Sequence, residues 1–271
     1  MLIDTHCHLN LGPYQDDYRD IIREALERGV AINNVGCDYQ TSVRAVQIAD
    51  EYADKMIWAS VGQHPTDTDQ PFNLQKFRAL ASSSEKVIAI GETGLDYFHL
   101  DKAGDVEYQK QQQKLLFLEH AELAHELNLP IIIHCRDAHD DMIELLMHVY
   151  TTASVHGPRP LKDRGVMHCF TGTALQAQSY IDLGFLISFP GIITFTDQYD
   201  DVVKMVPSDH FVVETDAPFL TPKPYRGQRN LPYYVEYTAR RVAELRDMTI
   251  DEVAETSTAN AKRLFKIDKT R

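Results

Sequence analysis

Short apolar segments alternate with longer amphipathic segments along the whole chain, and this alternation is what most limits its fold. Near-continuous apolar runs of this kind are typical of strands buried on both faces, as in parallel sheets. The predicted strands are Leu2–Thr5, Ala31–Val35, Met56–Val61, Val87–Ile90, Pro130–Ile133, Gly165–Met167, Phe185–Phe189 and Phe211–Val213. Helical patterns lie between them, among them Gln15–Arg28, Thr41–Tyr52, Val106–Leu127 and Ala138–Val149. The alternation predicts an α/β fold, a (β/α)8 TIM barrel.

A doubly wound open sheet is the alternative fold, but no glycine-rich phosphate loop follows the first predicted strand. We expect a single domain over residues 1–271, because the chain has no linker or break in composition. Late in the chain, Thr249 and Glu252 have the spacing of a capping box, which predicts the start of a helix running toward Ala259.

Composition limits the functions open to the chain. Acidic residues number 40 against 27 basic ones, for a formal net charge of −13. A protein that neutralises many phosphates of a long duplex is usually basic, so extended non-specific nucleic-acid binding is not expected. An acidic protein can still act on a phosphate ester if metal ions supply the local positive charge.

The same sequence carries no targeting signal that we recognise. No run of about 18 apolar residues predicts a membrane span, and the N-terminus lacks the pattern of a secretory signal. We therefore expect a cytoplasmic protein with reduced thiols. The four cysteines form no CxxC pair, which argues against a disulfide framework or a thiolate zinc site.

Candidate metal ligands stand at the ends of five predicted strands. The active site of such a barrel lies at the C-terminal ends of its strands. The residues found there are His6, His8, Glu92, His134, His168 and Asp216. Imidazoles and carboxylates are ligands for Zn²⁺, Mn²⁺ and similar ions. A single histidine at a strand end is often structural, but six such residues together predict a metal centre.

Six ligands exceed what one catalytic ion needs, so the set favours two divalent metal ions per chain. We assign His6, His8 and Asp216 to the first ion. His134 and His168 are assigned to the second ion, and Glu92 is assigned as the bridge between the two. These ligand types do not choose among Zn²⁺, Mn²⁺, Mg²⁺, Co²⁺ and Ni²⁺.

Several longer stretches also carry a family signal. They are IDTHCHL (3–9), GQHP (62–65), GETGLDY (91–97), IHCRDA (133–138), HCFTG (168–172) and ETDAPFLTP (214–222). In this order they resemble the TatD family of metal-dependent deoxyribonucleases, part of the amidohydrolase-like superfamily. The resemblance implies a barrel, a binuclear site with the same six ligands, and metal-dependent DNA hydrolysis, typically exonucleolytic from the 3′ end of single strands.

The predicted reaction is cleavage of a DNA phosphodiester bond by a water that two metal ions activate. The candidate catalytic residues are Asp216, Glu92 and His64. Asp216 is a metal ligand and also the candidate general base. His64 is a candidate for binding a substrate phosphate or protonating the leaving oxygen, or else a supporting histidine held by Pro65.

Arg136 is a candidate for gripping a phosphate, or else for a structural pair with Asp137 or Asp140. Asp96 is expected either to orient a ligand histidine or to cap a turn.

The loop that holds Arg226 and Arg229, with Lys223 and Tyr225, is a candidate for binding a single strand. Its alternative is an exposed loop whose charges are solvated.

Two functions from different substrate classes stay open. The first is a nuclease whose partner is single-stranded DNA or a nucleotide-type substrate, with no obligate protein partner and no membrane. The second is a binuclear hydrolase of a small-molecule phosphodiester, lactone, ester or amide. Many binuclear amidohydrolases carry a carboxylated lysine at the end of strand four, where this chain has Glu92, which favours the nuclease. The pathway, whether DNA repair, DNA degradation or small-molecule metabolism, is left open.

Overall fold

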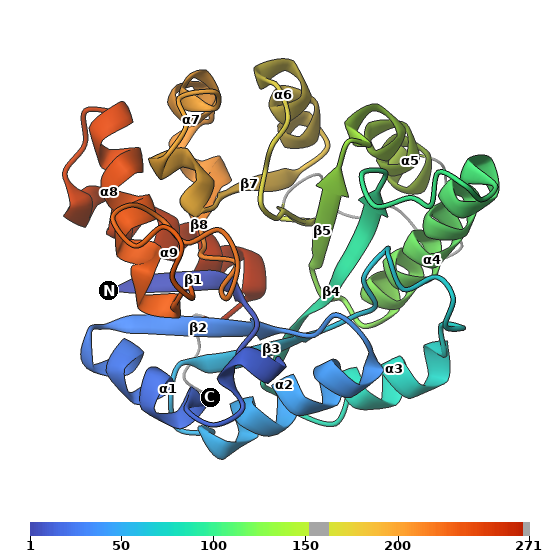
Figure 1. Ribbon diagram of the computed structural model, residues 1–271, viewed down its shortest axis with the longest axis horizontal. Helices are drawn as coiled ribbons and strands as arrows, with labels where there is room; N and C mark the ends of the chain where they lie inside the picture. The colour runs from blue at the N-terminus through green and yellow to red at the C-terminus, as the bar shows by residue number, and fades with distance from the viewer. Residues whose placement is uncertain (152–162, 268–271) are drawn as a thin grey trace.

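The computed structural model of the protein describes residues 1–151 and 163–267. Eight parallel strands form one sheet in chain order (Figure 1). The strands are β1 (Leu2–Cys7), β2 (Val30–Val35), β3 (Ile57–Val61), β4 (Val87–Asp96), β5 (Ile131–Arg136), β6 (Gly165–Met167), β7 (Phe185–Phe189) and β8 (Phe211–Val213). The ends of the sheet meet where Asp216 N–H donates to His6 O at 2.9 Å and His8 N–H donates to Ala217 O at 2.8 Å. The predicted (β/α)8 barrel is confirmed.

Helices surround the sheet, with α1 to α3 beside β2 and β3, and α4 and α5 beside β4 and β5 (Figure 1). The helices are α1 (Tyr18–Glu27), α2 (Tyr39–Glu51), α3 (Leu74–Ala81), α4 (Val106–Glu126), α5 (His139–Thr151), α6 (Ala174–Asp182), α7 (Asp200–Met205), α8 (Val235–Leu245) and α9 (Ile250–Phe265). Short 3₁₀ turns cover Gly12–Tyr14, Gly191–Thr194, Ser208–His210 and Pro232–Tyr234. Among the described residues, no helix combines the length and apolar character that a membrane crossing requires.

Local capping explains where the predicted helix ends shift. The helix predicted over Gln15–Arg28 begins at Tyr18, because a 3₁₀ turn that contains Pro13 comes first. The helix predicted from Thr41 begins two residues earlier, because Thr41 is the third residue of a capping box whose cap is Asp38. The predicted capping box of Thr249 and Glu252 is confirmed as the start of α9.

The fourth strand is longer than predicted. The predicted strand covers Val87–Ile90 with Glu92 at its end, but β4 continues to Asp96. The pairing of β4 with β5 shifts register between Ile90 and Thr93, which is the mark of a bulge, and then continues to Asp96. Gly94 permits this close approach, because a Cβ there would lie 1.9 Å from the carbonyl oxygen of His134. Glu92 is therefore held inside a strand rather than in a loop.

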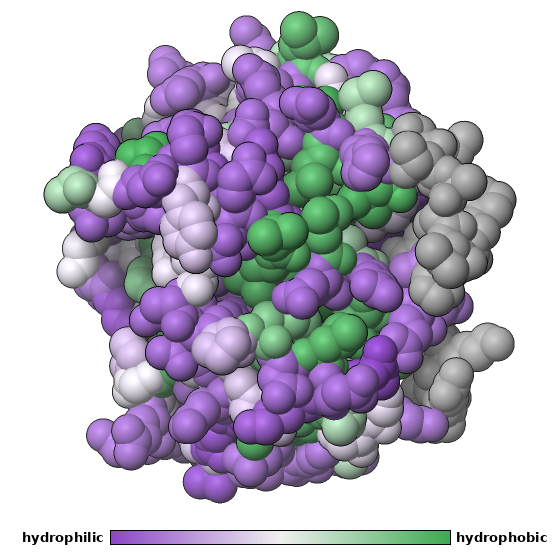
Figure 2. Space-filling model, turned by 90° about the vertical axis from the view of Figure 1, so that its right-hand side faces the viewer, coloured by the Kyte–Doolittle hydropathy of each residue, from purple (hydrophilic) through white to green (hydrophobic). Residues whose placement is uncertain are grey.

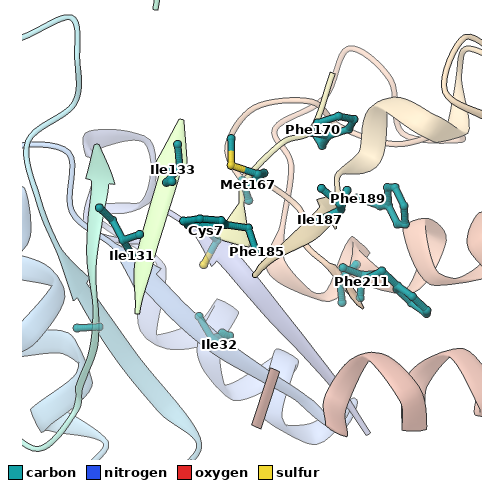
Figure 3. Close-up of a cluster of buried hydrophobic side chains, with 14 of the residues drawn as sticks. Cys7, Ile32, Ile131, Ile133, Met167, Phe170, Phe185, Ile187, Phe189 and Phe211 are labelled. Carbon is teal, nitrogen blue, oxygen red and sulfur yellow. The ribbon is translucent and has the colours of Figure 1, made fainter. Parts of the chain in front are cut away.

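Two apolar layers alternate along the strands. One set of side chains packs between the sheet and the helices, and Figure 3 shows part of it, including Ile131 and Ile133 of β5. The other set points into the barrel and packs against α9. It consists of Ile3, Ala31, Ile88, Ile132, Val166, Leu186 and Val212 from the strands, and Ala261, Leu264 and Phe265 from α9. Strand alternation then directs His134 and His168 into the barrel as well, at the carboxyl end. The apolar layer fills the other end.

Candidate metal centre

Glu92 lies at the centre of the predicted ligands and is 3% exposed. Its Oε2 atom is 3.2 Å from His6 Nε2 and 3.8 Å from His8 Nε2. Its Oε1 atom is 2.8 Å from His134 Nδ1 and 3.2 Å from His168 Nε2. Among the predicted ligands, each carboxylate oxygen therefore faces one pair of imidazoles, which is the arrangement expected of a residue shared by two ions.

Asp216 joins the pair of histidines from β1. Its Oδ1 atom is 3.4 Å from His8 Nε2, and the Nε2 atoms of His6 and His8 are 3.2 Å apart. Ligand atoms of His6, His8 and Asp216 all lie within 4.8 Å of one another. Neutral imidazole nitrogens and a carboxylate converging in this way are suited to a divalent cation.

Glu92, His134 and His168 form a second group of the same compactness. The structure thus brings all six predicted ligands together, and the two expected groups are among several overlapping sets of converging donor atoms. Their donor set fits divalent metal ions.

Two ligand histidines are fixed through their other ring nitrogens. His8 Nδ1 is 2.8 Å from the carbonyl oxygen of Val35, and His168 Nδ1 is 3.0 Å from Glu214 Oε1. Such partners set the tautomer and orientation of a ligand histidine, which leaves the facing nitrogen free for a metal.

Glu214 is a site residue to which the sequence analysis gave no role. It is 1% exposed and also accepts hydrogen bonds from the Ser188 hydroxyl at 2.6 Å and from Cys169 N–H at 2.7 Å. Its position two residues before Asp216, and so on the same side of an extended chain, is a signal that could have identified it.

Asp96 fills both roles between which the sequence left a choice. Its Oδ2 atom is 3.2 Å from His134 Nε2, so it orients that ligand. Its Oδ1 atom accepts a hydrogen bond from His99 N–H at 3.0 Å, which caps the turn after β4. The Gln113 amide bonds to the backbone N–H and carbonyl of Asp96. The carboxylate is thereby held in place from the α4 side.

The electrostatics of the site keep its carboxylates ionised. Burial alone would raise the pKa of Glu92, but the charges of His168 and His6 hold it well below its ordinary value. Burial likewise opposes ionisation of Asp216, but a hydrogen bond with His8 and the charge of His168 lower its pKa. Two buried anions are thus available to cations.

His64 lies beside the second group with its side chain 18% exposed. Its Nε2 atom is 3.6 Å from Glu92 Oε1. Its Nδ1 atom is 2.7 Å from Thr66 Oγ1 and accepts a hydrogen bond from Thr66 N–H at 3.3 Å. The ring proton therefore sits on Nε2 and points into the site. Burial lowers the pKa of His64 to about 4, so the ring is a neutral donor.

His120 supports the segment that carries His64. It is fully buried, and its Nε2 atom accepts a hydrogen bond from Gln63 N–H at 3.0 Å. Its Nδ1 atom is 2.8 Å from the carbonyl oxygen of Leu116 in α4. Burial lowers the pKa of His120 to about 4. The neutral ring therefore links α4 to the end of β3.

Cys37 also lies at the site, which the sequence analysis did not foresee. Its Sγ atom is 3.4 Å from His8 Nδ1 and 3.9 Å from Glu92 Oε2. The signal was its place just after the second strand, at the end where the ligands of the other strands lie. Burial raises the pKa of its thiol, which disfavours the reactive thiolate.

Arg136 lies on the rim rather than in either expected pair. It is exposed, and its guanidinium stands 3.8 Å from the centre of the Phe98 ring. No ion pair joins Arg136 to a carboxylate in the described part of the chain, and Asp140 instead accepts a hydrogen bond from the Gln176 amide at 3.0 Å.

The two arginines after β8 differ in their surroundings. Arg226 donates to the carbonyl oxygen of Thr221 at 3.0 Å and stands 3.9 Å from the centre of the Phe195 ring. Arg229 forms an ion pair with Asp17, with one nitrogen 3.1 Å from Oδ1. Arg229 therefore ties the loop to the N-terminal part of the chain.

Comparisons with known proteins agree with this geometry. A family model described as TatD related DNase matches residues 3–266. The chain is 43% identical over 272 residues to the uncharacterized metal-dependent hydrolase YabD of Bacillus subtilis (strain 168), covering 99% of this chain and 100% of that protein. It is 35% identical over 275 residues to the uncharacterized metal-dependent hydrolase YcfH of Escherichia coli (strain K12), covering 100% and 97%. The crystal structure of YjjV, a TatD homolog from Escherichia coli K12, superposes with a TM-score of 0.85 at 30% identity, covering 98% of each chain.

The contact between Glu214 and His168 predicts an effect on metal affinity. Glu214→Gln keeps the shape of the side chain but removes the charge that polarises His168. We expect about tenfold weaker binding of one metal equivalent, measured by competition with a chelator. Ser188→Ala, which removes only the hydrogen bond to the other Glu214 oxygen, should change affinity less. Unchanged affinity in Glu214→Gln would contradict the role of this pair.

The buried His120 predicts a pH dependence of stability. Its pKa is about 4 in the folded chain and 6.5 when unperturbed, so the unfolded chain binds a proton first as pH falls. The contribution of neutral His120 is complete above about pH 6.5 and is lost as pH falls toward about 4. Across this window the free energy of unfolding of wild type should fall by on the order of 3 kcal/mol more than that of His120→Gln. Denaturant titrations at several pH values measure this, and parallel curves would refute it.

Proposed function

The chain belongs to the TatD-related DNase family of metal-dependent hydrolases, and we propose that it cleaves phosphodiester bonds of DNA, from the 3′ end of single strands. The observation that carries this proposal is the position of Glu92, whose two oxygens face separate pairs of histidines. A carboxylate in this position, on β4 and between the two groups of predicted ligands, can coordinate one ion through each oxygen.

The proposal assigns two divalent ions to this site. His6, His8 and Asp216 hold the first, and His134 and His168 hold the second, with Glu92 shared. The compactness of both groups supports this assignment. Such ions, when bound, supply a nucleophile from water near neutral pH and neutralise charge on the leaving oxygen.

Asp216 is the proposed general base. Its side chain is 14% exposed while that of Glu92 is 4% exposed, so Asp216 is the ligand carboxylate more open to the mouth of the barrel. Its lowered pKa keeps it ionised and able to accept a proton from an attacking water.

His64 is proposed to bind substrate rather than to protonate it. The neutral ring presents its Nε2 proton to the site, where a phosphoryl oxygen can accept it. Its low pKa argues against a protonated imidazolium as the acid for the leaving oxygen.

Arg136 and Arg226 are proposed to contact the substrate from two sides of the mouth. Each guanidinium lies over an aromatic ring, and neither forms an ion pair with a carboxylate of the described residues. Arg229 was also predicted to bind substrate, and its pairing with Asp17 supports instead a role in holding the loop.

The alternative function is hydrolysis of a small-molecule phosphodiester, lactone, ester or amide. The same ligand set can serve it, and the net charge of −13 favours a compact substrate over a long polyanion.

If Asp216 is the general base, its replacement should affect turnover much more than metal binding. Asp216→Asn should retain most of the bound metal and lose about 10²- to 10⁴-fold in kcat, because an amide cannot take up the proton. The assay is digestion of a 5′-labelled single-stranded oligonucleotide by metal-stripped protein resupplied with each divalent ion. A ladder that shortens by one nucleotide at a time is the expected product of the wild type.

Asp137→Asn is the matched control, since it makes the same substitution at an exposed rim position after β5. It should leave the ladder unchanged. Near wild-type turnover in Asp216→Asn would refute the base assignment. No ladder with any ion, from a protein that binds two metals, would move the assignment to the small-molecule hydrolase.

A further inference from the structure

Two half-exposed phenylalanines stand on opposite sides of the barrel mouth. Phe98 follows β4 and is 52% exposed, and Phe219 follows β8 and is 54% exposed. Because the strands are arranged in chain order around the barrel, β4 and β8 lie half a turn apart. The ligand groups around Glu92 lie between these two positions. Neither ring is used by the catalytic chemistry described above.

Phe98 is linked to the second ligand group through a short series of contacts. Its ring centre is 4.9 Å from that of His99, whose Nδ1 atom is 2.7 Å from Asp96 Oδ2. The same carboxylate oxygen is 3.2 Å from His134 Nε2. The Arg136 guanidinium, 3.8 Å from the ring centre, completes a cationic and aromatic rim beside His134.

Phe219 lies against the first ligand group. Its ring centre is 6.2 Å from that of His8, in an edge-to-face arrangement with an interplanar angle of 67°. Its backbone is fixed at both ends, because Phe219 N–H donates to Asp216 O at 2.8 Å and the Asn230 side chain donates to Phe219 O. The exposed ring is therefore held in a defined place next to a ligand.

We propose that Phe98 and Phe219 are base-stacking residues that hold the nucleobases on either side of the scissile phosphate. This inference rests on the proposed nuclease function and specifies the substrate as an unpaired strand. Every base has a π face that stacks on an aromatic side chain, whatever the sequence. In a duplex those faces are covered by neighbouring base pairs, so rings at the mouth select single strands.

The charge of the protein makes this mode of binding appropriate. A net charge of −13 gives a strand little long-range attraction to the protein as a whole. Stacking supplies binding free energy that does not depend on counterion release. Arg136 is the local cation on the Phe98 side.

The test combines removal of each phenylalanine ring from the protein with removal of single bases from the oligonucleotide. Phe98→Ala and Phe219→Ala are each assayed on a single-stranded oligonucleotide and on versions with one abasic site at successive positions near the 3′ end. Each variant should lower kcat/KM on the intact strand about tenfold, mainly through KM. Each should have no further effect when its own base is missing, and the two variants should respond to different positions.

Leu115→Ala is the matched control. Leu115 is 55% exposed in the middle of α4, on the outer side of the barrel. Figure 2 shows hydrophobic surface on that side of the molecule. This variant should behave as wild type on every strand. Equal losses on intact and abasic strands, or no losses in either phenylalanine variant, would overturn the stacking assignment.

A binding measurement separates this inference from the nuclease proposal. Fluorescence anisotropy of a labelled phosphorothioate thymidine oligonucleotide, which resists hydrolysis, reports binding to the full chain. Weaker binding in both variants, in a protein that cleaves no DNA, would support the stacking residues and overturn the nuclease. DNA cleavage by wild type with unchanged binding and cleavage in both variants would overturn the stacking residues alone.

Discussion

Glu92 places a negative charge almost wholly out of water, where an unpaired carboxylate would be strongly disfavoured. Five imidazoles lie within 3.8 Å of its oxygens, and those of the four predicted ligand histidines supply the compensation. Protonated histidines can supply the positive charge that offsets Glu92 only while no metal is bound. Divalent ions require neutral imidazoles, so binding of metal displaces protons from the same site. The interior of the mouth is therefore suited to cations, and the carboxylates of Asp96 and Glu214 lie against His134 and His168, two of the proposed ligands.

Closure of the barrel assembles this arrangement from distant parts of the chain. The hydrogen bonds between β1 and the residues after β8 bring His8 and Asp216 together. Strand alternation aims the histidines of β5 and the segment after β6 inward, above an apolar layer that α9 covers at the other end. The ligands sit within strands or directly after them, so their spacing depends on the sheet and not on flexible loops. The proposed substrate residues lie on the rim above, where the loops begin.

The sequence sufficed to predict the barrel and to find six side chains that converge at its mouth, because two rules act together. Apolar runs identify buried parallel strands, and chemistry in such barrels lies at the strand ends. The length of β4 could not be predicted, because GETGLD has no apolar run and its extended pairing depends on Gly94 meeting the backbone of β5. The roles of Glu214 and Cys37 and the pairing of Arg229 with Asp17 depend on distances between residues far apart in the chain. The sequence alone does not show that Phe98 and Phe219 lie on opposite sides of the barrel mouth, because this depends on the positions of β4 and β8 in the closed sheet.

In the proposed site, two metal ions share the Glu92 carboxylate. The most direct measurement is the metal content per chain of wild type and Glu92→Gln, determined by mass spectrometry after dialysis against a limiting divalent ion, with the exposed Glu122→Gln as control. We expect two ions per chain in the wild type and the control, and fewer than one in Glu92→Gln, because both groups lose their shared anion. Two ions retained in Glu92→Gln would contradict it.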